Sequence, residues 1–112
     1  MSYEAVLDAL GDRTRRRILD RLRAGPMPVS AIADGLPVSR PAVSRHLRVL
    51  LACGLVRYEE QGTRNLYRIE ARGVEELRGW VERFWDDVLG RFADHVEGAE
   101  RPSSRRRTGG ST

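Results

Sequence analysis

The spacing of apolar residues along this chain changes twice, and the order of the changes restricts the fold. Up to Gly54, apolar residues recur every three or four positions, which predicts α-helices. Residues 55–60 and 64–70 change to an alternating pattern around Gln61-Gly62-Thr63, which predicts a β-hairpin that turns at these three residues. Helical spacing resumes from Val74 to Val96. We therefore expect a mainly α-helical domain with one small β-hairpin.

Helix-breaking residues divide the first half of the chain into four predicted helices. These run from Tyr3 to Gly11, from a cap at Asp12 to Gly25-Pro26, from a cap at Ser30 to Gly35-Leu36-Pro37, and from a cap at Ser39 to Gly54. Asp and Ser side chains accept hydrogen bonds from free N–H groups at a helix start, whereas Gly and Pro end helices. Two helices around a Gly-containing turn, followed by a hairpin, are the parts of a winged helix-turn-helix. The expected order is four helices, two strands and a last helix.

The helix that begins at Ser39 has a polar face without acidic residues. No Asp or Glu occurs between Pro37 and Val56. A helix with such a face fits the major groove of double-stranded DNA and offers donors to it. The predicted DNA-binding residues, including two at the hairpin tip, are Ser39, Arg40, Pro41, Ser44, Arg45, Arg48, Thr63 and Arg64.

The predicted DNA-binding residues have different expected targets. Arg40 and Arg45 are placed to pair with guanine edges, and Arg48, a turn further on, to bind a backbone phosphate. The serine hydroxyls can bond either bases or phosphates. Thr63 and Arg64 are expected at the neighbouring minor groove. The alternative is that the arginines form an ordinary solvated helix face.

All 20 basic residues are arginine, and opposite charges are segregated along the chain. Residues 1–70 hold 12 arginines and 8 acidic residues, residues 71–100 hold 4 and 8, and residues 101–112 hold 4 and none. This segregation indicates one surface for a polyanion and another for a different partner. We expect residues 1–100 to form a DNA-binding and dimerisation domain. Residues 101–112 lack apolar content and are expected to form a disordered Arg-rich tail.

The last helix carries four of the seven aromatic residues, more than one small core can cover. A two-fold partner would bury the rest, so we expect a homodimer formed through the first and last helices. The predicted interface residues are Tyr3, Val6, Leu7, Val81, Phe84, Trp85, Val88 and Phe92. Symmetry then implies a palindromic DNA site with half-sites about one helical turn apart. The alternative is a pocket for an apolar ligand between the last helices.

Three stretches occur in the order Gly11-Asp-Arg-Thr-Arg-Arg-Arg-Ile-Leu19, Ser39-Arg-Pro-Ala-Val-Ser-Arg-His-Leu47 and Gly54-Leu-Val56. Together they resemble the ArsR/SmtB family of bacterial transcriptional repressors, over about residues 3–95. The resemblance implies a dimer built by the first and last helices, in which the helix of residues 39–54 reads an inverted repeat. It also implies repression, usually of the protein's own operon and its neighbours, and it identifies no effector.

Many members of this family release DNA when a metal ion binds, and the resemblance locates their ligand positions. The third-helix cysteine positions fall on Pro28, Ser30 and Ala33 here, and the last-helix positions fall on Ala71, Gly73, Phe84 and Asp87. Of these, only the Asp87 carboxylate can bind a metal ion. We therefore predict no metal site and no cofactor. A metal- or redox-responsive repressor of the same fold is the alternative.

Three other residues have side chains that bind metals or react with oxidants. His46 is expected to pack and form hydrogen bonds on its helix, and Cys53 to be a small buried apolar residue. Their alternative roles are ligation and redox sensing. His95, with Asp94 and Glu97, is the alternative site for a metal bound across a dimer.

Four arginines lie close together near the start of the second predicted helix: Arg13, Arg15, Arg16 and Arg17. Positive charge at a helix N-terminus is unfavourable, so these side chains require compensation. We expect them to pair with carboxylates of Asp20 and of the acidic last helix. The alternative is that DNA phosphates supply the negative charge.

Other functional classes find little support. No nucleophile with an adjacent base, carboxylate pair or phosphate-binding glycine loop is present, so we expect no enzyme. The longest apolar run, residues 49–56, is far short of the ~20 residues that a membrane span needs. The N-terminal residues contain no signal-like hydrophobic stretch, so we expect a cytoplasmic protein without membrane partners. A dimeric protein-interaction module without DNA binding is the alternative from a different class.

Overall fold

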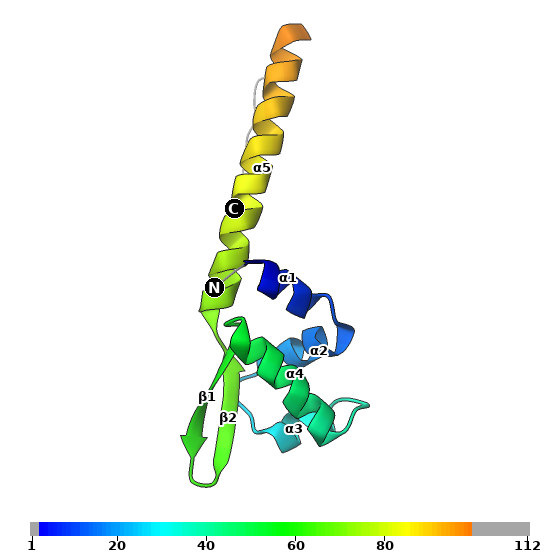
Figure 1. The fold of residues 1–112 in the computed structure, drawn as a ribbon, viewed down its shortest axis with the longest axis vertical. Coiled ribbons are helices and arrows are strands. Elements are labelled where there is room, and N and C mark those ends of the chain that lie inside the picture. The colour runs from blue at the N-terminus through cyan, green and yellow to red at the C-terminus, as the bar shows by residue number, and fades with distance from the viewer. Residues whose placement is uncertain (1–2, 100–112) are drawn as a thin grey trace. The chain divides into compact units, whose positions relative to one another are not determined.

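Figure 1 shows the computed structural model, which describes the backbone of residues 3–99 and the side chains of residues 3–93. The elements are α1 (Tyr3–Leu10), α2 (Arg13–Leu22), α3 (Val29–Asp34), α4 (Arg40–Ala52), β1 (Val56–Gln61), β2 (Arg64–Ile69) and α5 (Ala71–Ala99). The predicted order and the mainly helical fold with one hairpin are confirmed. The chain divides into two compact units between Gly79 and Trp80. The predicted tail, residues 101–112, lies outside the described residues.

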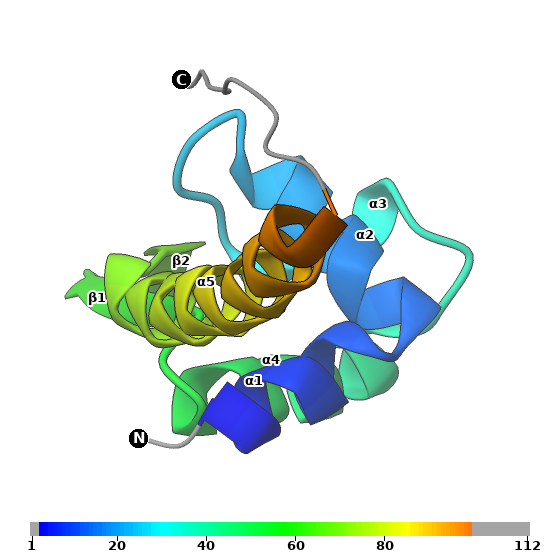
Figure 2. The ribbon, with the colours of Figure 1, turned by 90° about the horizontal axis from the view of Figure 1, so that it is seen from above.

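The first unit has one core to which all four of its complete helices contribute. The buried apolar residues are Val6, Ala9, Ile18, Leu22, Ile32, Val43, Leu47, Leu50, Cys53, Leu55 and Val56. Three of them come from α4, at a spacing that puts them on one side of the helix. The helices α1, α2 and α3 all pack against α4, and α1 lies alongside it in Figure 2. The core therefore fixes both the position and the rotation of α4.

One residue expected at the dimer interface belongs to this core instead. Val6 is completely buried within its own chain, so it is not available to a partner subunit. The short helix α1 turns Val6 and Ala9 inward and leaves Leu7 41% exposed. Periodicity identified the apolar side of α1 correctly, but it did not separate the part that the chain itself covers from the part it leaves open.

Side-chain caps begin two helices as predicted, whereas the cap of α3 differs. Asp12 accepts a hydrogen bond from the backbone N–H of Arg15 at 3.0 Å, and Ser39 accepts one from Ala42 at 3.2 Å. The predicted cap at Ser30 is wrong, because α3 begins at Val29 and the cap position is Pro28. The Pro28 carbonyl already accepts the first helical hydrogen bonds, which places Ser30 inside the first turn.

The hairpin pairs β1 and β2 antiparallel, from Val56 opposite Ile69 to Gln61 opposite Arg64. Only Gly62 and Thr63 remain in the turn, one residue fewer than predicted. Gly62 has a φ of +62°, a conformation that favours glycine. The turn therefore fixes the register and leaves Thr63 and Arg64 exposed at the tip.

A short backbone bridge joins the hairpin to the connection between α2 and α3. The N–H of Met27 donates to the Tyr67 carbonyl at 3.0 Å, and the N–H of Tyr67 donates to the Met27 carbonyl at 2.9 Å. The sequence did not predict this bridge, because Pro26 and Pro28 flank Met27 and prolines are poor strand residues. The bridge holds the hairpin, the wing of the fold, against the start of α3.

Helix α5 begins in close contact with the turn that follows α4. The N–H of Gly73 donates to the Gly54 carbonyl at 2.7 Å, and a Cβ at Gly73 would lie 2.6 Å from the Cys53 carbonyl oxygen. That contact is between backbone atoms, which cannot move aside as a flexible side chain can. Only glycine fits at this position without a shift of the backbone.

We expect Gly73→Ala to lower the free energy of unfolding by about 1–3 kcal/mol, the usual effect of inserting a group into a packed site. Urea denaturation measures this change. Gly90→Ala on the same helix is the control, because its Cβ would meet no atom within 4 Å and alanine favours helix. A Gly73→Ala protein as stable as the control would contradict the proposed steric constraint.

The described part of the second unit is the portion of α5 after Gly79, in which aromatic side chains contact one another. The rings of Trp80 and Phe84 stack with centroids 5.3 Å apart, and those of Phe84 and Trp85 meet edge to face at 5.4 Å. These rings lie in a stripe of apolar residues that solvent reaches. No helix in the described part of the chain has both the length and the apolar character to cross a membrane.

Candidate nucleic-acid interface

The outward side of α4 carries the side chains predicted to read DNA. Arg40, Arg45 and Arg48 are exposed, as are Ser39 and Pro41, and Ser44 is half-buried. Within the described residues, no ion pair or hydrogen bond engages the guanidinium groups of these three arginines. The helix therefore presents unneutralised positive charge to solvent on the side opposite its buried residues.

Two of the four clustered arginines of α2, Arg15 and Arg16, find partners within the protein, but these are not the expected carboxylates. Arg15 donates from Nε to the Ala9 carbonyl at 2.8 Å, and Arg16 donates to the Leu10 carbonyl at 2.6 Å. Carbonyls at the end of a helix lack helical partners and carry partial negative charge, so α1 provides the compensation. The predicted pairing with Asp20 is wrong for these two residues, since Asp20 instead lies 3.7 Å from Arg23.

His46 connects α4 to the start of α2. Its Nδ1 lies 3.3 Å from a terminal nitrogen of Arg15 and 4.0 Å from Asp12 Oδ1. Arginine can only donate, so Nδ1 accepts this hydrogen bond in the neutral form of the ring. The contact supports the expected hydrogen-bonding role of His46.

Asp12 caps α2, and the hydrogen bond from the Arg15 backbone N–H lowers the pKa of its carboxyl group below the ordinary value. The nearby His46 and Arg15 lower it further, although partial burial opposes them. Because the folded-state pKa lies below the unfolded one, the ionised cap stabilises the fold above about pH 4. This contribution disappears as the pH falls through the lowered pKa.

We expect Asp12→Ala to destabilise the protein by about 1 kcal/mol at pH 7, the usual effect of losing a cap. The difference should shrink at pH 3, and urea denaturation at the two pH values measures it. Asp12→Asn retains a capping oxygen without the charge, so its stability relative to Asp12→Ala should change little with pH. A difference between wild type and Asp12→Ala that grows on acidification would contradict this assignment.

A groove of about 280 Å³ separates the first turn of α4 from the wing. Its lining residues are Pro28, Val29, Ser30, Arg40, Arg64, Asn65 and Tyr67. The groove brings together Arg40 and Arg64, which are 24 positions apart in the sequence. The sequence did not identify Ser30 and Asn65 as parts of this site. The hairpin register was the available signal for Asn65, because it puts Asn65 and Tyr67 on one face of the hairpin.

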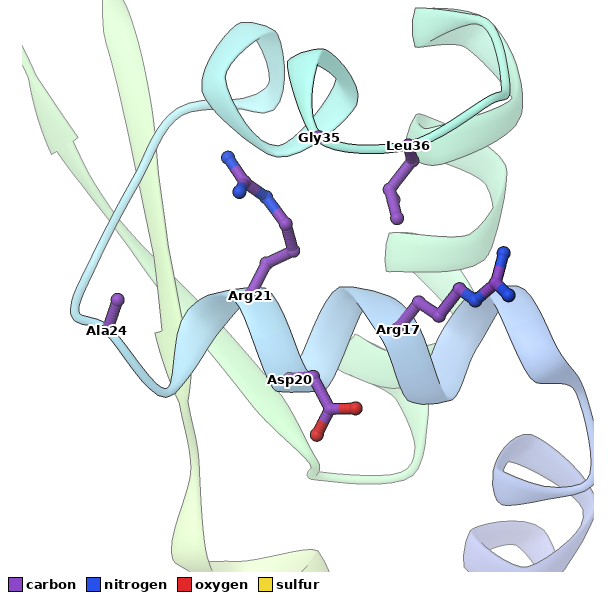
Figure 3. Close-up of a pocket in the computed structure, with 6 residues that line it drawn as sticks. All are labelled: Arg17, Asp20, Arg21, Ala24, Gly35 and Leu36. Carbon is purple, nitrogen blue, oxygen red and sulfur yellow. The ribbon is translucent and has the colours of Figure 1, made fainter.

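A second groove, of about 390 Å³, lies between α2 and the turn that follows α3 (Figure 3). Arg21 extends from α2 toward Gly35 and donates to the Ala31 carbonyl at 2.6 Å, whereas Arg17 and Asp20 point away (Figure 3). A Cβ at Gly35 would overlap the Arg21 guanidinium group. Arg21 therefore ties α2 to α3, and the lining side chains do not converge on a ligand.

The apolar residues predicted to form the dimer interface are partly open to solvent, apart from Val6. Tyr3 is half-buried, and the predicted residues of α5, Val81, Phe84, Trp85, Val88 and Phe92, are exposed. Leu89, which is 56% exposed, extends this stripe and was missed. It lies four residues after Trp85 and three before Phe92, so the helical spacing in the sequence was an available signal for it.

The residues considered as metal or redox sites that the structure describes are His46, Cys53 and Asp87. Among the residues whose side chains are described, no three His, Cys, Asp or Glu side chains come together in a group that would hold a metal ion. Cys53 is buried, its thiol donates to the Leu50 carbonyl at 3.6 Å, and burial raises its pKa. A raised pKa keeps the thiol protonated and unreactive. His95 lies outside the residues whose side chains are described.

The sequence is similar to known regulators of transcription. A family model described as a helix-turn-helix domain matches residues 10–59. The HTH-type transcriptional regulator Rv2034 of Mycobacterium tuberculosis is 45% identical over 96 residues, which cover 86% of this chain and 90% of that protein. The transcriptional repressor SdpR of Bacillus subtilis is 30% identical over 79 residues, which cover 70% and 88%.

Solved structures show the same similarity. An ArsR-like transcriptional regulator from Rhodococcus sp. RHA1 has a TM-score of 0.78 and 35% identity, over 88% of this chain and 92% of that one. The homodimeric winged helix-turn-helix DNA-binding domain Mb0332 of Mycobacterium bovis, a possible ArsR-family transcriptional regulator, has a TM-score of 0.60 and 34% identity. That comparison covers 75% of this chain and 78% of the domain.

Proposed function

This chain belongs to the ArsR/SmtB family of winged helix-turn-helix transcriptional regulators, which bind DNA, and from this premise we propose that it is a homodimeric repressor. In this proposal each subunit places α4 in the major groove at one half-site of an inverted repeat. The protein catalyses no reaction and responds to no metal ion.

The unpaired arginines on the outward side of α4 carry the proposal. Arg45 and Ser44 lie in the middle of the helix, where side chains that enter the major groove reach base edges. Arg48 lies one turn further and is assigned to a backbone phosphate. Thr63 and Arg64 at the tip of the wing lie next to the same DNA. Because the core fixes the rotation of α4, these side chains need no rearrangement of the helix to reach DNA.

Two observations support dimerisation and an inverted repeat. The stripe on α5 exposes large apolar side chains, with Trp85 51% and Phe92 62% exposed, which is typical of an interface. The similar domain from Mycobacterium bovis is described as homodimeric. A two-fold dimer presents its two α4 helices symmetrically, so its preferred DNA site has the same symmetry.

Repression without a metal effector follows from two further arguments. The similar protein of Bacillus subtilis is named a transcriptional repressor. The positions at which metal-sensing relatives carry cysteines hold Pro28, Ser30 and Ala33 here, and these side chains cannot bind thiophilic metals.

Selection of bound fragments from genomic DNA, followed by a gel-shift titration, tests the proposal. We expect recovered fragments to share an inverted repeat, and the logarithm of the affinity to fall with the logarithm of salt by about 0.9 per phosphate contacted. Zinc, arsenite and oxidant should leave the complex intact. Recovery of random fragments would reject the operator, and release by zinc or arsenite would reject metal independence.

A further inference from the structure

We propose that the groove between α4 and the wing binds one phosphodiester group of the DNA backbone, which Arg40 and Arg64 hold together. This inference rests on the proposed function and makes it more specific. It also changes the role expected of Arg40 from the sequence, from reading a guanine to fixing the position of the backbone.

The side chains that line this groove match the chemistry of a phosphate. They supply two guanidinium groups from Arg40 and Arg64, an amide from Asn65, and hydroxyl groups from Ser30 and Tyr67. These are the side chains that commonly bond phosphate oxygens, and guanidinium groups can do so with two parallel hydrogen bonds. No carboxylate is among the lining residues. An anion that enters the groove therefore meets donors and no fixed negative charge.

The charge of Arg64 distinguishes it from the other arginines of the wing. Arg57 lies 3.6 Å from a carboxylate oxygen of Glu70, and Arg68 lies 3.4 Å from one of Glu59. Within the described residues, neither Arg64 nor Arg40 has such a partner. Two positive charges beside one groove repel each other, and an anion between them removes this repulsion.

The two other grooves of the first unit lack this combination. The groove along α2 includes the carboxylate of Asp20 among its lining residues. The groove at the base of the wing is lined by Arg23 and Arg68, which are already paired with Asp20 and Glu59. Of these three grooves in the described first unit, the one between α4 and the wing alone combines arginines that have no ion-pair partner with a lining free of carboxylates.

The positions of Arg40 and Arg64 favour the DNA backbone as the source of the phosphate. Arg40 is the first residue of α4, the helix proposed to enter the major groove, and Arg64 is the first residue of β2, beside the turn proposed to approach the minor groove. A DNA strand that separates these two grooves must pass between the two elements. The Met27–Tyr67 bridge and the Ser39 cap fix the two walls before DNA arrives.

Affinity measurements on the recovered operator and on a random duplex test the inference with single and double variants. Arg40→Ala and Arg64→Ala should each weaken binding about tenfold on both duplexes, because a phosphate contact carries no sequence information. In the double variant, the slope of the logarithm of affinity against the logarithm of salt should become shallower by about 0.9, the value for one phosphate. A change of about 1.8 would correspond to two phosphates. Arg57→Ala is the control, because it removes the same charge from the same hairpin at an already paired site.

Replacement of single phosphates by neutral methylphosphonates tests the site without a protein variant. Replacement at one position in each half-site should weaken the binding of wild-type protein about tenfold. The same replacement should leave the affinity of the double variant unchanged. An altered base preference of Arg40→Ala with an unchanged salt slope would overturn the inference while the proposed function stands. The inference would also be overturned if the two single variants showed that Arg40 and Arg64 contact two different phosphates.

A titration with inorganic phosphate in the absence of DNA separates the backbone from a free anion. Submillimolar binding that Arg40→Ala and Arg64→Ala abolish would assign the groove to a free anion and overturn the inference. Failure of wild-type protein to prefer any duplex would instead reject the proposed function itself.

Discussion

Trp85→Ala is expected to raise the dissociation constant of the dimer by about 30-fold to 1,000-fold. Truncation of a central interface tryptophan costs about 2 kcal/mol or more, and two-fold symmetry removes the side chain from both subunits. Each 1.4 kcal/mol corresponds to a factor of ten. Half of the Trp85 side chain is open to solvent in its own chain, so a partner subunit has a large apolar area to bury.

Sedimentation equilibrium over a range of protein concentrations measures this shift. Arg83→Ala is the control, because Arg83 lies on the opposite side of α5 from Trp85 at 3.6 residues per turn. Circular dichroism of both variants checks that the helices remain. An unchanged dimer in Trp85→Ala would remove this residue from the interface, and equal weakening by Arg83→Ala would argue against the apolar stripe as the contact surface.

Arg45→Ala is expected to weaken binding to the operator by about 1–3 kcal/mol, or about 5-fold to 150-fold, and to relax base preference at one position of each half-site. Arg45 is exposed in the middle of α4 and has no partner in the described part of the chain, so its donors are available to a base. Binding to a random duplex should weaken much less. The ratio of the two affinities therefore reports base reading.

Arg48→Ala provides the comparison, because the loss of a phosphate contact should weaken binding to both duplexes alike. Titrations of fluorescently labelled operator and random duplex at one fixed salt concentration measure both ratios. Equal losses on the two duplexes for Arg45→Ala would assign it to the backbone and leave base reading to other residues of α4.

Local signals in the sequence predicted most of the fold. Asp12 and Ser39 cap helices because their oxygens lie next to free N–H groups, and this depends on only three neighbouring residues. The change from helical to alternating spacing after Gly54 located the hairpin for the same reason. These features are set over one or two turns of chain, so the sequence contains all the information that they need.

Contacts between distant residues were not predictable in this way. The Met27–Tyr67 bridge joins residues 40 positions apart, and its backbone hydrogen bonds leave no trace in side-chain spacing. The partners of Arg15 are carbonyls at the end of another helix, which no charge count reveals. The meeting of Arg40 and Arg64 at one groove likewise depends on how the wing packs beside α3 and α4.

The guanidinium group of Arg15 links three helices, so that they are expected to move together. From α2 it holds the last turn of α1 through Ala9 and reaches His46 on α4. A tilt of α1, which the sequence predicts to contact the partner subunit, must either carry α4 with it or break these bonds. We expect the Arg15→Ala protein to lose less affinity than wild type when the two half-sites of the operator are moved apart. Affinity measurements on operators with a series of spacer lengths would measure this difference.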